Sequence, residues 1–144
     1  MESATMGRVP TQAMIENVGD MWQVAEGKKT SGEARKVDVC DALVDTGATL
    51  LTLPTRLIQQ LGLRKTGCKR VNTSQGPVEA GIYEAVWLTV QGRSCTLDVL
   101  EAPDSTPVLI GQVPLELLDF VVDPRGQKLI GNPAHGGEHM YDMY

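Results

Sequence analysis

The sequence predicts a mainly β protein of one domain with one or two short helices. Short apolar runs rich in Val, Ile and Leu recur along the 144 residues, and turns containing Gly or Pro separate them. Gln91-Gly92-Arg93 lies between two such runs and is typical of a hairpin. A chain of this length buries enough surface for one core, but it is cramped for two domains.

Three segments are expected along the chain. Residues 11–132 should form the domain, residues 1–10 a flexible N-terminal tail, and residues 133–144 a C-terminal tail that is a candidate interface strand. No apolar run reaches the roughly 18–20 residues needed to span a bilayer, and residues 1–10 have no signal-peptide core. We therefore expect a cytoplasmic protein that does not bind a membrane.

The composition of the chain argues against several classes of function. The formal net charge of −5 argues against nucleic-acid binding, which usually needs a basic face. Aromatic residues make up only 4%, so the core must be mostly aliphatic. The three cysteines are odd in number and widely spaced, which fits neither a disulfide framework nor a zinc site.

The secondary structure can be predicted element by element. Residues 11–24 are interrupted by Gly19-Asp20 and are interpreted as strand–turn–strand. Residues 71–84 are predicted to form a hairpin with a polar tip. Further strands are predicted over residues 36–44, 49–53, 85–90, 94–100, 108–110, 120–122 and 128–130. Helices are predicted over 54–61, with Pro in the first turn and Gly62 after the last, and over 114–118.

An approximate repeat relates the two halves of the chain. In the first half an apolar strand leads into Asp45-Thr46-Gly47, and a helix and a hairpin follow. In the second half an apolar strand ends at Leu109-Ile110-Gly111, again before a helix and a hairpin. Each half therefore places a glycine directly between a buried strand and a helix.

Asp45 is the strongest candidate for a catalytic acid, because it follows three apolar residues, 42–44. Burying a carboxylate is costly unless it is hydrogen-bonded or shares its proton. Gly47 allows a tight loop and a close approach of its backbone N–H, and Thr46 adds a hydroxyl that can brace the loop. An Asp-Thr-Gly triplet also occurs in ordinary turns, where the aspartate only caps the turn. The second glycine element favours the catalytic interpretation.

Hydrophobic–hydrophobic–Asp–Thr–Gly–Ala, at residues 43–48, resembles the active-site motif of retropepsin-like aspartic proteases with a single Asp-Thr-Gly, of the prokaryotic cytosolic type. The resemblance covers roughly residues 11–132. It implies an acid-protease barrel with one domain per subunit, active as a homodimer. Residues 109–111 match the second element of that family, and residues 71–78 match its flap.

The resemblance also implies roles for particular residues. Asp45 would be the catalytic aspartate, Thr46 would lock the two active-site loops across the dimer, and Gly47 would shape the aspartate site. The expected substrate-binding residues are Ala48, Thr49, Gln75, Gly76 and Ile110. Viral members of the family often have an acid where this chain has Thr49, and their flap tips are glycine-rich and apolar rather than polar.

The implied chemistry needs two carboxylates, one protonated and one ionised. Because the chain has one Asp-Thr-Gly, two Asp45 side chains would have to meet on a twofold axis. The ionised one activates a water that attacks the peptide carbonyl, and the protonated one donates to the carbonyl oxygen. We therefore expect an aspartic endopeptidase that acts on an extended polypeptide and needs no cofactor or metal.

Two alternatives remain open. The fold could serve as a catalytically silent module for dimerisation or peptide binding, for which the polar flap and Thr49 leave room. His135-Gly136-Gly137-Glu138-His139 matches an inverted zinc-protease pattern, which would indicate a metal-dependent hydrolase. That pattern needs a helix, and two adjacent glycines disfavour one by roughly 1 kcal/mol each. We therefore expect these histidines to lie in a solvated tail or an interface strand.

Overall fold

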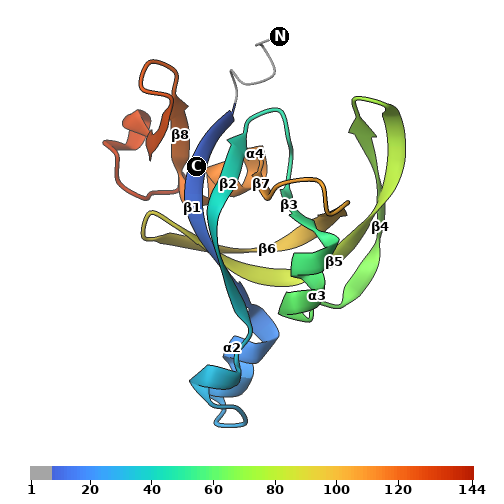
Figure 1. Cartoon of the computed structure of the whole chain (residues 1–144). Coiled ribbons are helices and arrows are strands. Elements are labelled where there is room, and N and C mark those ends of the chain that lie inside the picture. The colour runs from blue at the N-terminus through green and yellow to red at the C-terminus, as the bar shows by residue number, and fades with distance from the viewer. Residues whose placement is uncertain (1–7) are drawn as a thin grey trace.

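Strands dominate the structure, a computed structural model that describes residues 8–144 (Figure 1). Of the expected N-terminal tail, residues 1–7 lie outside the described residues, and residues 8–10 begin the first strand. The strands are β1 (Arg8–Asn17), β2 (Lys36–Asp45), β3 (Leu51–Pro54), β4 (Lys65–Thr73), β5 (Gly76–Val90), β6 (Arg93–Ala102), β7 (Leu109–Ile110), β8 (Phe120–Asp123) and β9 (Lys128–Gly131). The α-helices are α2 (Val18–Ala25), α3 (Thr55–Leu61) and α4 (Gln112–Leu118), and 3-10 turns cover Ser31–Glu33 and Pro133–His135.

Seven of the strands form one sheet that closes on itself. Their order is β1-β2-β7-β3-β6-β5-β4, and β1 pairs with β5 as well as with β2. The β1–β5 pairing closes the barrel, and β4 pairs only with β5 and extends beyond the closed part. Strands β8 and β9 form a separate hairpin. The predicted mainly β class is confirmed.

The two halves of the sequence repeat meet at the centre of the sheet. Strand β2 runs parallel to β7, with Leu43 opposite Leu109 and Val44 opposite Ile110. Strand β7 also pairs antiparallel with β3, where Ile110 is opposite Leu51. The loop that follows β2 therefore lies directly beside the glycine that follows β7.

The strand–turn–strand interpretation of residues 11–24 is wrong. Strand β1 ends at Asn17, and helix α2 follows. The Asn17 side chain accepts the Asp20 amide at 2.9 Å and caps the helix, while its own amide group donates to the Leu61 carbonyl at 2.7 Å. The Gly19-Asp20 pair that suggested a turn is therefore the first turn of a capped helix.

Asp20 ties helix α2 to the barrel. Its side chain is buried and accepts hydrogen bonds from Lys29, from the Arg35 amide and from the Arg35 guanidinium, at 2.8–3.0 Å. The Arg35 side chain contributes most to holding the pKa of Asp20 below its usual range, and burial opposes the shift. The helix and the loop after it are thus joined through one buried carboxylate.

The other two α-helices begin and end close to the predicted positions. Pro54 is the N-cap of α3, and Gly62 ends it in the left-handed conformation at φ 65°. Helix α4 begins at Gln112, two residues before the predicted start, and Asp119 ends it at φ 58°. The hairpins predicted around residues 74–75, 91–92 and 124–127 are all present.

The core is aliphatic, as the composition predicted. Among residues 8–144, Phe120 is the aromatic side chain that is fully buried. The thiols of Cys40, Cys68 and Cys95 are free, and burial raises the pKa of Cys95 to about 11. The largest completely buried side chains are Ile15, Leu51, Leu53, Leu61, Leu88, Ile110, Leu115 and Leu118. Within the described residues no helix has the length and apolar character needed to cross a membrane.

An Asp20→Asn substitution should destabilise the domain by about 2–3 kcal/mol, because it leaves charged donors facing a neutral amide in a buried position. The free energy of unfolding from urea titration measures the loss. Asp38→Asn is the matched control, since Asp38 is exposed on β2 and should change stability by less than about 0.5 kcal/mol. Equal effects of the two substitutions would contradict the anchoring role of Asp20.

Candidate active site

Asp45 is the last residue of β2, where the buried strand emerges into the loop of residues 46–50. Its side chain is 16% exposed, so the carboxylate lies at the mouth of the core and remains reachable. Oδ1 accepts the Gly47 amide at 2.9 Å, and Oδ2 accepts Nε of Arg8 at 3.2 Å. The structure thus places one hydrogen-bonded, partly exposed carboxylate at the end of an apolar strand.

The loop that carries Asp45 is held from its other side by the start of α4. The amides of Gly111, Gln112 and Val113 donate to the carbonyls of Leu50, Ala48 and Thr49 at 2.9–3.1 Å. A Cβ atom on Gly111 would lie 2.7 Å from backbone atoms of both Ala48 and Leu50. Glycine is therefore required at position 111 by the close approach of the two segments.

The structure brings Asp45, Thr46 and Gly47 together in this loop, with Ala48 and Thr49 beside them. Thr46 and Thr49 are exposed, and Ala48 is partly buried. The Thr46 hydroxyl has no hydrogen-bond partner within residues 8–144, so it is available to a second subunit. The Gly47 amide donates to Oδ1 of Asp45, so the loop turns back towards its own aspartate.

Ile110 differs from the expectation that it contacts substrate. Its side chain is completely buried between β2 and β3. In the single subunit it packs beneath the active-site loop and offers no surface to a peptide. The physical reason is that Ile110 points to the core face of β7, whereas Leu109, on the opposite face, is only partly buried.

Gln75 and Gly76 lie at the turn of the β4–β5 hairpin, which is the expected flap (Figure 1). The turn is closed by Thr73, whose hydroxyl donates to the Gly76 carbonyl at 2.7 Å and accepts the Gln75 amide at 3.1 Å. Val78 lies on the same face of β5 as buried Ile82, because the two residues are four positions apart on the strand. Val71 pairs with Val78, so both valines lie on the face of the hairpin that continues from Ile82. The hairpin has a polar tip, and behind it one face carries Val71 and Val78 together with Lys69 and Ala80.

The base of this hairpin is fixed to the barrel. The Tyr83 hydroxyl donates to Glu101 at 3.0 Å, and the Thr55 hydroxyl donates to the same carboxylate at 2.7 Å. Burial, followed by the hydrogen bond to Glu101, raises the pKa of Tyr83. The tip is therefore the part of the hairpin that can move, because its base is joined to β6 and α3.

Arg8 is a residue of the site that the sequence did not reveal. It was placed in a flexible tail, but it begins β1 and lies opposite Asp45 in the β1–β2 register. A single basic residue near the start of a chain gives no signal of such a contact. The alternation of β1 against β2 could have indicated it once the strand was known to begin at residue 8.

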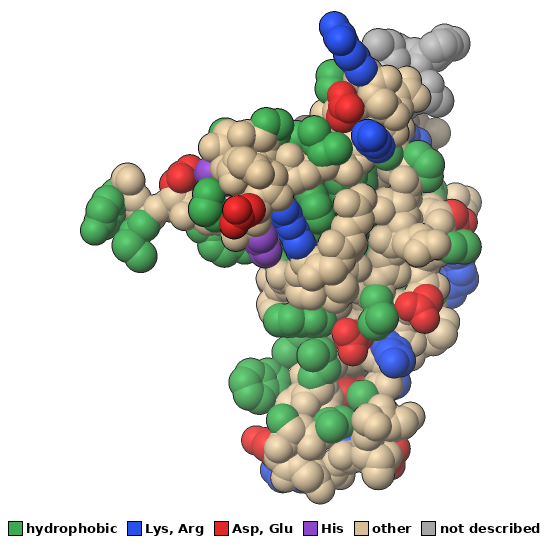
Figure 2. All heavy atoms as spheres, turned by 90° about the vertical axis from the view of Figure 1, so that its left-hand side faces the viewer, with side chains coloured by type: hydrophobic (Ala, Val, Ile, Leu, Met, Phe, Trp, Pro, Cys, Tyr) green, Lys and Arg blue, Asp and Glu red, His purple; other side chains and the backbone are tan. Residues whose placement is uncertain are grey.

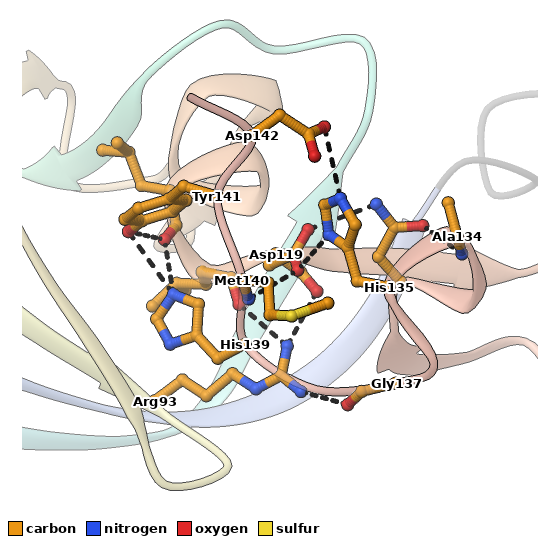
Figure 3. Close-up of polar contacts among 12 residues, drawn as sticks. Arg93, Asp119, Ala134, His135, Gly137, His139, Met140, Tyr141 and Asp142 are labelled. Atoms are coloured by element: carbon orange, nitrogen blue, oxygen red, sulfur yellow. Dashed lines mark hydrogen bonds and ion pairs between the residues drawn. The ribbon is translucent and has the colours of Figure 1, made fainter. Parts of the chain in front are cut away.

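A second polar cluster lies at Asp119, which ends α4 (Figure 3). The buried Asp119 carboxylate accepts the Met140 amide at 3.1 Å and the Asn132 amide group at 3.2 Å, and it contacts Nδ1 of His135 at 2.6 Å. Burial raises the pKa of Asp119, but these hydrogen bonds outweigh it and lower the pKa to about 2. The bond to Asp119, with a second contact to Asp142 at 3.3 Å, raises the pKa of His135.

The C-terminal segment is therefore attached to the barrel at several points. Arg93 adds hydrogen bonds to the carbonyls of Leu118, Asp119 and Gly137, and its guanidinium lies 4.5 Å from the centre of the Phe120 ring. Beyond these anchors Figure 2 shows the segment projecting past the two histidines. Its exposed apolar side chains are Met140, Tyr141, Met143 and Tyr144.

The histidines of this segment do not form the helix that the zinc-protease pattern needs. His135 ends a 3-10 turn, and His139 contacts the Leu117 carbonyl and the Tyr141 hydroxyl. Over residues 8–144 no group of three or more His, Cys, Asp or Glu side chains is arranged to hold a metal ion. The cluster at Asp119 is an anchor for the C-terminal segment.

Comparison with known proteins agrees with this geometry. A family model described as aspartyl protease matches residues 30–113, which is more than half of the 144-residue chain. The match includes Asp45-Thr46-Gly47 and Leu109-Ile110-Gly111 together with the hairpins between them. The chain belongs to the aspartyl protease family.

One solved structure similar to this chain is that of the EIAV protease complexed with the inhibitor HBY-793. The two share 23% sequence identity with a TM-score of 0.50, and the match covers 75% of this chain and 86% of that chain. At this identity the likeness shows the fold, and it confirms the predicted retropepsin-like barrel. No curated protein matches the chain.

A Gly111→Ala substitution should destabilise the domain by about 2–3 kcal/mol, because the new methyl group meets backbone atoms that cannot move independently. Urea unfolding measures this loss, and the amide signals of residues 46–50 should shift in NMR spectra. Gly67→Ala is the matched control, since a Cβ there has no neighbour within 4 Å. A neutral Gly111→Ala would show that the loop is not held in this way.

The attachment of the C-terminal segment should depend on pH. Because folding raises the pKa of His135 above its ordinary value of 6.5, protonated His135 stabilises the attachment fully below pH 6.5. This stabilisation is lost as the pH rises through the pKa that His135 has in the folded protein. Because folding lowers the pKa of Asp119 from 3.8 to about 2, ionised Asp119 stabilises the attachment fully above pH 3.8. This stabilisation is lost as the pH falls towards about 2. Attachment is therefore strongest between pH 3.8 and 6.5.

The hydrogen-exchange protection factor of the Met140 amide, which donates to Asp119, reports this attachment. It should decrease as the pH rises above 6.5 in the parent protein, and His135→Gln should remove that dependence. His139→Gln is the comparison, because His139 contacts a carbonyl and a hydroxyl but no carboxylate. Constant protection of Met140 across this range in the parent would contradict the role of His135.

Proposed function

We propose that two copies of this chain form an aspartic endopeptidase, with one Asp45 from each subunit in a single active site. The observation that carries the proposal is the position of Asp45, whose carboxylate emerges from a buried strand, is fixed by the Gly47 amide and is still 16% exposed. Membership of the aspartyl protease family supports the same chemistry.

A single subunit has only half of the required group. Hydrolysis by this class needs one carboxylate that accepts a proton and one that donates it. The sequence contains one Asp-Thr-Gly, and no second aspartate is in contact with Asp45 among residues 8–144. A second copy related by a twofold axis supplies an identical carboxylate.

In the proposed dimer the two Asp45 side chains lie about 3 Å apart, so that like-charge repulsion makes them share one proton. The ionised carboxylate accepts a proton from a bridging water as the water oxygen attacks the peptide carbonyl carbon. The protonated carboxylate donates its proton to the carbonyl oxygen. When the C–N bond breaks, the leaving nitrogen takes the proton that the first carboxylate had accepted from water, and a hydroxyl of the tetrahedral intermediate returns a proton to the second carboxylate. One carboxyl group is then again protonated and the other ionised.

The β4–β5 hairpin supplies the cover for an extended polypeptide. Val71 and Val78, which share one face of the hairpin, would contact apolar side chains of the substrate, and Val78 is 47% exposed in the uncovered subunit. Gln75 and Gly76 at the turn, with Ala48 and Thr49 in the active-site loop, would contact the peptide backbone. Closure of the hairpin would also remove water from the reacting bond.

The exposed apolar end of the chain supports association of two subunits. Met140 and Tyr141 are 46% and 64% exposed, although the anchors at Asp119 hold the segment in place. Contiguous exposed apolar residues of this kind mark interaction surfaces. The segment of residues 140–144 would therefore be part of the subunit interface.

The alternative function is a module with this fold that dimerises or binds peptides without cleaving them. The observation that favours it is the polar tip of the hairpin, which closes on itself through Thr73 rather than presenting apolar atoms to a partner. The module and the protease make opposite predictions for peptide hydrolysis.

An Asp45→Asn substitution should reduce peptide cleavage at least about a hundred-fold, because an amide can neither share nor accept the proton. Cleavage of a peptide library at several pH values from acidic to neutral is the measurement. Activity should decrease at high pH, where both carboxylates ionise, and it should resist EDTA but be blocked by pepstatin-like inhibitors.

Asp41→Asn is the matched control, since Asp41 is an exposed aspartate four positions earlier in the same strand. It should cleave the library at the parental rate. Hydrolysis by Asp45→Asn that equals the parent would contradict the assigned chemistry. A parent that binds library peptides and hydrolyses none of them would support the module instead.

A further inference from the structure

The two carboxylate oxygens of Asp45 have partners of different kinds. Oδ1 accepts the Gly47 amide, which belongs to the same loop, two residues further on. Oδ2 accepts Nε of Arg8 at 3.2 Å, from the first described residue of β1. The first bond is a property of the loop, whereas the second depends on the position of one long side chain.

The contact between Arg8 and Asp45 is easily exchanged. It uses one nitrogen of the guanidinium instead of the two-pronged arrangement that makes arginine–carboxylate pairs strong. The Arg8 side chain is 43% exposed, and it makes no other hydrogen bond or ion pair within the part of the chain that the structure describes. Pairs of this kind contribute little to stability because water and salt compete with them.

Arg8 cannot take the place of the second acid in the proposed reaction. A guanidinium remains protonated in proteins and has no acceptor atom, so it can neither receive a proton nor share one with Asp45. While Nε lies on Oδ2, it uses one of the two acceptor positions of that oxygen. The single subunit therefore holds a carboxylate whose charge is balanced but which cannot act as half of an acid–base pair.

We propose that Arg8 is a positioning residue that covers Oδ2 of Asp45 in the single subunit and releases it to the Asp45 of a second subunit when two chains associate. The inference rests on the proposed function, because that function requires two Asp45 side chains to meet. The contact with Nε of Arg8 holds the lone carboxylate at the end of β2. Association then breaks two intrasubunit ion pairs, and the two carboxylates take up one proton from solvent, which they share.

The exchange has a consequence for the strength of the dimer. Each dimer that forms breaks two Arg8–Asp45 contacts, so these contacts oppose association. Removing the cation should strengthen the dimer, although arginine at an interface is usually expected to strengthen it. Added salt weakens the contact in the single subunit and should therefore act in the same direction as the substitution.

Arg8→Gln and Arg125→Gln are the variants to compare with the parent. Arg125 is an exposed arginine in the β8–β9 turn, and only its backbone amide is engaged there. Sedimentation velocity over a range of protein concentrations gives the dimer dissociation constant. Arg8→Gln should lower this constant roughly 2- to 30-fold, as expected for the release of two exposed ion pairs, and Arg125→Gln should leave it unchanged.

Repeating the comparison in an Asp45→Asn background separates the proposed exchange from a general effect of charge. Without the carboxylate at position 45 there is no ion pair to break, so Arg8→Gln should then have no effect on the dissociation constant. An equal effect of Arg8→Gln in both backgrounds would overturn the proposal. So would an unchanged or weaker dimer in Arg8→Gln, or a parent that stays monomeric at every concentration.

The same series distinguishes this proposal from the proposed function. A parent that dimerises, responds to Arg8→Gln as expected and cleaves no peptide would refute the endopeptidase while leaving the exchange at Asp45 intact. If the parent cleaves peptides but Arg8→Gln leaves the dimer dissociation constant unchanged, the exchange at Asp45 is refuted and the endopeptidase is not.

Discussion

The hydrogen bond from the Gly47 amide to Asp45 is the interaction on which the site depends. Strand β2 delivers an acid from a completely buried residue, Val44, to the surface of the barrel, where an unsupported carboxylate would be free to turn in any direction. The amide two residues later fixes Oδ1, while Oδ2 accepts the more easily exchanged contact from Arg8. A Cβ atom at position 47 would lie 3.2 Å from Oδ1, so the Asp45 side chain would have to shift by a few tenths of an ångström.

The rest of the barrel keeps this short loop in place. Parallel pairing of β2 with β7 puts the two glycine-containing segments side by side, and three amides at the start of α4 donate to the carbonyls of the loop. The loop is thus supported from the second half of the chain, which the sequence repeat had indicated. The same α4 ends at Asp119, so one helix connects the support of the active-site loop to the anchor of the C-terminal segment.

Much of this arrangement could be predicted from the sequence because it depends on strong local signals. The strands were predictable from apolar runs separated by polar or glycine-containing turns, and helix α3 from the proline before it and the glycine after it. The Asp-Thr-Gly motif identified the candidate acid. Helix α2 was missed because its stability comes from long-range contacts: Asn17 bonds to Leu61, and Asp20 bonds to Arg35. Arg8 and the cluster at Asp119 were missed for the same reason, since no spacing along the chain indicates them.

The central claim is that each active site takes one Asp45 from each of two chains. Mixing parent and Asp45→Asn subunits at constant total concentration, with time for exchange, tests it directly through the rate of peptide cleavage. If both carboxylates are required, an equal mixture should show about a quarter of the parental activity, because only dimers of two parent chains are active. Activity of about half, in direct proportion to the parent chains present, would show that each chain acts alone and would contradict the account.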